Sequence, residues 1–67
     1  MKDTDYIPSG LFTKLENQFK ATNMYAEIFM GDLYLCKDGG GNIGIRTIGE
    51  LKLAYFKLTN DQLIIPE

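Results

Sequence analysis

The fold is decided by residues 32–48, which read DLYLCKDGGGNIGIRTI. Two runs of strand-forming residues, 32–37 and 43–48, flank the segment from Asp38 to Asn42. Asp, Gly and Asn tolerate the positive φ angles that tight hairpins need. This stretch therefore predicts two antiparallel strands joined by a glycine-rich hairpin loop.

A helix is predicted on the N-terminal side of this hairpin. Residues 1–8 form a short polar stretch for which we expect a mobile lead, and Ser9 is a suitable N-cap. Apolar residues then recur at the helical spacing of three and four. They are Leu11, Phe12, Leu15 and Phe19.

Two interpretations of residues 20–31 stay open. Thr22, Ala26 and Phe29 continue the helical spacing, which allows one helix over residues 11–30 that ends at Gly31. Alternatively, Asn23 ends the helix in a left-handed conformation and residues 25–30 form a strand. We favour the second interpretation, because Phe29 and its aromatic and β-branched neighbours suit a strand.

The C-terminal part is predicted to complete a β-meander. Gly49 interrupts the strand pattern, residues 51–58 are expected to form a further strand, and residues 63–65 a last short one before Pro66. The predicted fold is therefore α+β, with one N-terminal helix packed on a small antiparallel β-meander of three to five strands. The 67 residues have room for one domain, over residues 9–67 after the lead.

Strand alternation divides the predicted sheet into two faces. The face expected to form the core with the helix consists of aliphatic residues and one phenylalanine: Ala26, Ile28, Met30, Leu33, Leu35, Ile43, Ile45, Ala54, Phe56 and Leu58. The second face is too apolar for a surface that meets only water. It contains Tyr25, Phe29, Tyr34, Cys36, Ile48, Leu51, Leu53 and Tyr55, with a few charged residues among them.

This second face is the candidate binding site. Its expected contact residues are Tyr25, Tyr34, Arg46, Leu53 and Tyr55. Tyrosines beside an arginine are typical of the centre of a protein interface. The expected partner is another protein or a second copy of the chain, and the expected role is that of a small protein-binding module, a regulator or an inhibitor.

The same face also allows three alternatives to a protein interface. The lead or the C-terminal strand could cover it, a small ligand could bind it, or single-stranded nucleic acid could stack on its tyrosines. The net charge of −2 and the scattering of seven basic residues along the chain disfavour general nucleic-acid binding.

The composition offers little for catalysis. The chain has no histidine, and Cys36 is its single cysteine, so the usual general base and a tetrahedral zinc site are both missing. The glycine run is followed by a strand pattern and not by the helix of a phosphate-binding loop. We therefore expect no catalytic residues, no metal, no cofactor and no enzymatic activity, and we expect Cys36 to be a buried or half-buried free thiol.

The setting is predicted to be the cytoplasm. A lone cysteine suits a reducing interior, and no run of apolar residues is long enough for a secretory signal or a membrane span. Lysine and isoleucine are frequent and Arg46 is the only arginine, a usage typical of a low-GC bacterium or its phages.

Overall fold

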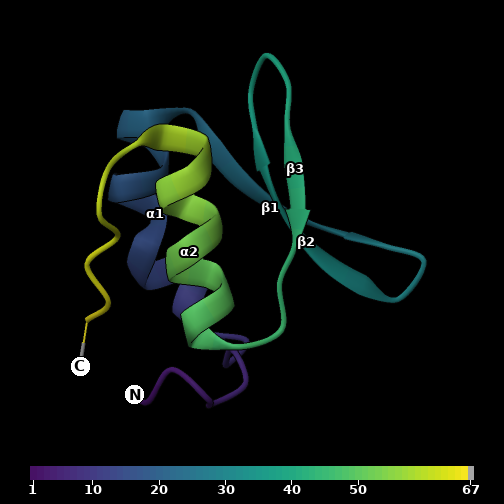
Figure 1. The fold of residues 1–67 in the computed structure, drawn as a ribbon, viewed down its shortest axis with the longest axis vertical. Coiled ribbons are helices and arrows are strands. Elements are labelled where there is room, and N and C mark those ends of the chain that lie inside the picture. The colour runs from purple at the N-terminus through teal and green to yellow at the C-terminus, as the bar shows by residue number, and fades with distance from the viewer. Residues whose placement is uncertain (67) are drawn as a thin grey trace.

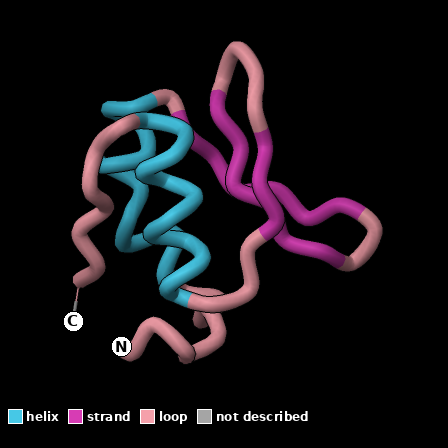
Figure 2. The backbone as a smooth tube through the Cα atoms, in the orientation of Figure 1, coloured by secondary structure: helices cyan, strands magenta, loops and turns pink. Residues whose placement is uncertain are grey.

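The computed structural model describes residues 1–66 and shows a small α+β fold, which confirms the predicted fold class. The elements follow in the order α1 (Leu11–Thr22), β1 (Met24–Phe29), β2 (Asp32–Lys37), β3 (Asn42–Gly44) and α2 (Ile48–Thr59). The strands form one antiparallel sheet in the order β1-β2-β3. The two helices lie side by side at one end of the molecule, and the two hairpins extend from them in different directions (Figures 1 and 2).

Helix α1 ends where the sequence predicts. Asn23 adopts the left-handed conformation, with φ 58°, and its amide bonds back to the carbonyls of the last helical turn. Asparagine is one of the few residues that enters this region at low cost. The interpretation with a break at Asn23 is therefore confirmed, and the single long helix over residues 11–30 is wrong.

The loop between β1 and β2 contains only Met30 and Gly31. Both have positive φ, 52° and 83°, as the two central residues of a type I′ turn require. The three glycines of the second loop also have positive φ. Gly41 in addition lies against Leu58, because a Cβ at this position would come within 2.9 Å of the leucine Cδ2.

The strand predicted over residues 51–58 is wrong, because residues 48–59 form helix α2. Thr47 and Glu50 make a capping box: the Thr47 side chain accepts from the Glu50 amide, and the Glu50 carboxylate accepts from the Thr47 amide. Residues 63–65 form no strand either. Ile64 is instead held to α1 by Gln18, whose side chain bonds both its carbonyl and its amide.

The core lies between the two helices and the inner face of the sheet. Its buried residues are Leu11, Leu15, Phe19, Met24, Leu35, Ile45, Ile48, Leu51, Ala54, Tyr55 and Leu63. Three predicted core residues lie outside it, since Ile28, Met30 and Phe56 are exposed. Ile28 does lie on the predicted side of the sheet, but the helices do not reach far enough along the sheet to cover it (Figure 1).

Residues 1–8, for which the sequence predicts a mobile lead, bond to the segment that joins β3 to α2. Tyr6 and Thr47 form an isolated antiparallel bridge, and the Ile7 amide donates to the Arg46 carbonyl. The carbonyls of Asp5 and Asp3 accept from the first two amides of α2, which have no acceptor within the helix. The Asp3 carboxylate also pairs with Lys52 at 2.8 Å.

Candidate interaction surface

The face of the sheet that points away from the helices is not covered by another layer of the described chain. We call it the open sheet face; it carries the side chains of Tyr25, Glu27, Phe29, Tyr34 and Cys36. Tyr25 is 48% exposed and Phe29 is 61% exposed. The strand part of the predicted second face is therefore confirmed for these positions.

Tyr34 lies at the centre of the open sheet face. It pairs across the strands with Gly44, and its ring covers that glycine, since a Cβ there would lie 3.6 Å from the ring. An aromatic ring over a cross-strand glycine protects backbone that has no side chain of its own. Tyr34 is therefore half-buried and held in place by its own sheet.

Arg46 is exposed beside Tyr34. The two residues line a shallow hollow of about 310 Å³ together with Asp32 and Glu50. The Arg46 backbone is fixed, because its amide donates to the Glu50 carboxylate at 2.8 Å. The predicted neighbourhood of Tyr34 and Arg46 is therefore present in the structure.

Tyr55 is not on this surface. It lies on α2, is 3% exposed and stacks on Phe19 with ring centroids 6.0 Å apart. Its hydroxyl lies 3.0 Å from the Thr22 hydroxyl and donates to the Gln18 carbonyl. The expectation that Tyr55 contacts a partner is wrong, because the side chain joins the two helices inside the core.

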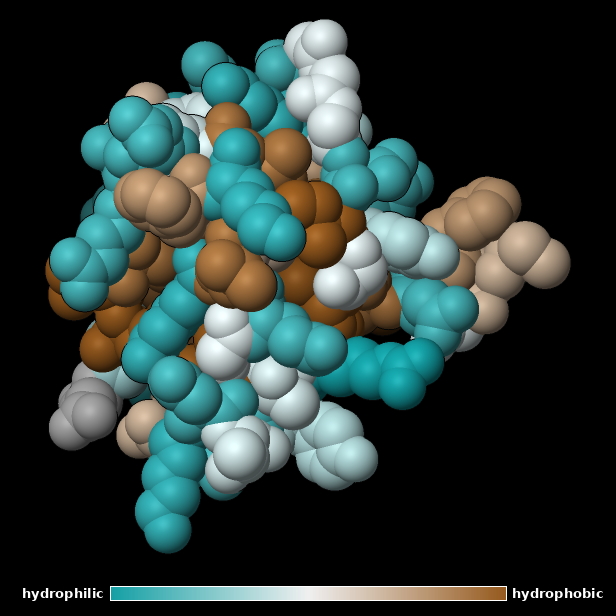
Figure 3. All heavy atoms as spheres, viewed as in Figure 1, coloured by the Kyte–Doolittle hydropathy of each residue, from teal (hydrophilic) through white to brown (hydrophobic). Residues whose placement is uncertain are grey.

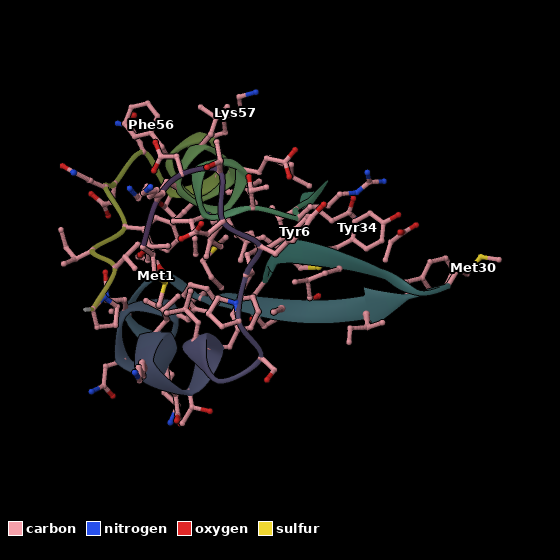
Figure 4. The ribbon with its side chains drawn as sticks, turned by 90° about the horizontal axis from the view of Figure 1, so that it is seen from below. Met1, Tyr6, Met30, Tyr34, Phe56 and Lys57 are labelled. Atoms are coloured by element: carbon pink, nitrogen blue, oxygen red, sulfur yellow. The ribbon has the colours of Figure 1, made fainter. Side chains whose placement is uncertain are left out.

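Leu53 is exposed, but on a different part of the molecule. It lies on α2 beside Phe56, and each of the two side chains is about half exposed. Figure 4 shows Phe56 on the helix, well separated from Tyr34 on the sheet. The five predicted contact residues are thus divided among the open sheet face, the core and the surface of α2.

Cys36 is a buried free thiol, as predicted. Burial raises the pKa of the thiol, and the nearby Glu27 carboxylate raises it further; the Cys36 Sγ lies 3.9 Å from the Glu27 Oε2. The Cys36 sulfur in turn raises the pKa of the Tyr25 hydroxyl opposite. A thiol with a raised pKa is a poor nucleophile at neutral pH, so this cluster has the properties of a packed side chain.

The tip of the β1–β2 hairpin is the most exposed apolar part of the molecule, and the sequence pattern did not predict it. Ile28, Phe29 and Met30 are 73%, 61% and 87% exposed. The hairpin extends away from the helices, with Met30 at its far end (Figure 4), and its pale brown side chains protrude from the surface (Figure 3). We call Ile28, Phe29 and Met30 the hairpin tip.

A sequence signal for Met30 was present. The predicted strands end at residue 30 and resume at residue 32, which leaves Gly31 alone between them. A hairpin needs at least two loop residues, so Met30 had to lie in the turn and therefore in solvent. No comparable signal exists for Ile28, because its exposure depends on where the helices lie.

Charged groups beside the hairpin tip are acidic. Glu27 and Asp32 are exposed on β1 and β2, and Asp32 pairs with Phe29 in the hairpin register. Among residues 1–66, no group of three or more potential ligand residues could hold a metal ion, and no helix has the length and apolar character of a membrane span. No family model, curated protein or solved structure matches the chain.

Proposed function

We propose that the protein is a non-catalytic binding module that contacts another protein chain through the hairpin tip and the adjoining open sheet face. The observation that carries this proposal is the exposure of three consecutive large apolar residues at the end of a projecting hairpin. Contiguous exposed apolar residues on a small protein mark an interaction site more often than they mark plain surface.

The backbone at Met30 supports the same proposal. A residue with a side chain costs about 1 kcal/mol or more in the left-handed region, and Asn or Gly is usual at this position of a type I′ turn. Met30 has φ 52° and is 87% exposed. Methionine adapts its shape to an apolar pocket, which is a use that could balance the backbone strain.

The charges around the tip favour a protein over an anionic surface. Glu27 and Asp32 would repel a phosphate backbone or an anionic membrane, and they would attract lysine or arginine at the rim of a protein pocket. The free thiol of Cys36 suits a reducing compartment, so we place the activity in the cytoplasm, as a regulator or inhibitor of the bound protein.

Site-specific photo-crosslinking tests this proposal. A benzophenone amino acid replaces Met30, and a matched probe replaces Ile64, which is also exposed but lies at the C-terminal end. In extract of the source cells, the probe at position 30 is expected to give a discrete crosslinked band that the probe at position 64 does not give. Identical products from the two positions would contradict a role for the hairpin tip.

A further inference from the structure

The two edges of the sheet differ in how they are covered. Beyond the end of β3, the chain is bonded by residues of the N-terminal lead, including the Tyr6–Thr47 bridge and the bond from the Ile7 amide to the Arg46 carbonyl. β1 is the other edge strand, and no described segment pairs with its outer side. An open strand edge is a template for pairing with a further strand.

The hydrogen-bond alternation identifies the backbone groups on that outer edge. The Asp38 amide donates to the Asn23 carbonyl, and bonded and non-bonded pairs alternate along an antiparallel ladder. Tyr25, Glu27 and Phe29 therefore direct their amides and carbonyls toward β2. Ala26 and Ile28 direct theirs outward, toward an incoming strand.

β1 has none of the features that usually protect an edge. Residues 24–29 contain no proline and no lysine, and the register with β2 runs through all six residues without a bulge. Beside this edge, Ile28 and Leu33 face a groove of about 310 Å³ that Pro8 and Phe12 also line. An added strand would bring further apolar side chains onto this uncovered part of the sheet.

Resting on the proposed function, we infer that the bound chain is a second copy of this protein, whose β1 pairs antiparallel with β1 about a two-fold axis at Ala26. This register brings Ala26 opposite its symmetry mate, Ile28 opposite the mate of Met24, and Tyr25 opposite the mate of Glu27. The strand is thus complementary to itself, with apolar pairs on the inner face and a phenol beside a carboxylate on the outer face.

The neighbouring register is disfavoured by charge. An axis at residue 27 would bring the two Glu27 carboxylates directly opposite each other, and like charges in that position destabilise a strand pair. With the axis at Ala26, the sheet becomes a continuous six-stranded sheet, and the hairpin tip of each copy lies near the end of α1 of the other. This arrangement gives the exposed Met30 an apolar neighbour in the second copy.

Sedimentation equilibrium over a concentration series tests the inference. The wild type is expected to approach twice the chain mass of 7.6 kDa. Ala26→Pro removes an outward amide that β2 does not use, and Ile28→Lys places a charge on the open edge at a side chain that is already 73% exposed. Each variant is expected to raise the dimer dissociation constant roughly tenfold or more. Ile64→Lys, an equally drastic change at another exposed isoleucine, is the matched control and is expected to leave it unchanged.

Disulfide trapping tests the register. In a Cys36→Ala background, Ala26→Cys is expected to crosslink the two copies, because Cα atoms of a bonded antiparallel pair lie about 5.5 Å apart, within disulfide range. Asn17→Cys, exposed on α1, is the control and is expected to stay reduced. Equal crosslinking at the two positions would contradict pairing at Ala26.

The outcomes separate this inference from the proposed function. A wild type that stays monomeric at every concentration overturns the inference, and so does a dimer that both edge variants leave intact. If the monomer still gives a position-specific crosslink to a different protein through position 30, the proposed function stands with a foreign partner. A monomer without any such crosslink overturns both.

Discussion

Tyr55 shows how one residue can have the composition of a contact site and the environment of a core. Its ring stacks on Phe19 and its hydroxyl bonds to α1, so it is both an apolar and a polar link between the helices. Tyr34, of the same residue type, is packed on only one side, over Gly44. The residue type alone does not distinguish these two environments.

Replacing Tyr55 by alanine is expected to lower the free energy of unfolding by about 3–5 kcal/mol, the usual cost of removing a buried aromatic side chain. Tyr55→Phe should cost only about 1 kcal/mol, the net value of its hydrogen bonds. Tyr34→Ala should also cost about 1 kcal/mol, because only cross-strand contacts are lost. Urea denaturation followed by circular dichroism measures all three. A Tyr34 variant less stable than the Tyr55→Ala variant would contradict the two environments.

The reactivity of Cys36 is predicted to depend on Glu27. Since burial and the Glu27 carboxylate raise the pKa of the thiol, the thiolate fraction at pH 8 lies below that of an exposed cysteine, and labelling should accelerate only at higher pH. Glu27→Gln removes the charge, lowers the pKa of Cys36 and should speed labelling at pH 8. Iodoacetamide labelling followed by mass spectrometry measures the rate. Glu16→Gln, on α1, is the control that should leave the rate unchanged, and a slower rate in Glu27→Gln would contradict the prediction.

At the scale of elements, local signals predicted α1, the break at Asn23, β1 and β2. Each of these depends on residues near in sequence, such as a helical apolar stripe or a glycine turn. Helix α2 was missed, although Thr47 and Glu50 have the spacing of a capping box and Ile48, Leu51 and Tyr55 have helical spacing. The same segment also alternates polar and apolar residues, and the strand interpretation followed the alternation.

The β1–β2 turn gives an element-scale prediction. Met30→Asn places the residue favoured in type I′ turns at φ 52°, so the hairpin should become more stable by up to about 1 kcal/mol. The same change removes the most exposed apolar side chain of the hairpin tip, so association should weaken. Thermal unfolding and sedimentation on the same sample measure both effects. Loss of stability would contradict the backbone strain inferred at Met30.

At the scale of the whole molecule, the fold class was predictable but the composition of the candidate site was not. Which side chains share the open sheet face with Tyr34 depends on where residues 48–59 lie, and their formation of a helix removed Leu53 and Tyr55 from that face. The exposure of Ile28 depends on how far the two helices extend along the sheet. Both properties arise from the packing of distant segments, which a single sequence does not specify.

The N-terminal lead gives a whole-molecule prediction. Deleting residues 1–6 removes two backbone hydrogen bonds to the start of α2 and the Asp3–Lys52 ion pair, which should lower the free energy of unfolding by about 2 kcal/mol. Lys52→Ala removes only the exposed ion pair and should cost less than about 1 kcal/mol. Urea denaturation compares the two variants. Equal losses would contradict a contribution from the backbone bonds.

The contacts of the lead also have a consequence for the order of events during translation. The lead leaves the ribosome first, but its partners at Arg46, Ile48 and Gly49 are made about 40 residues later, which takes roughly 2–8 seconds at ordinary elongation rates. In that interval β1 and β2 can already form a hairpin while neither edge of the nascent sheet is closed. The chain is therefore most exposed to aggregation, and most dependent on chaperones, between synthesis of the glycine loop and emergence of α2.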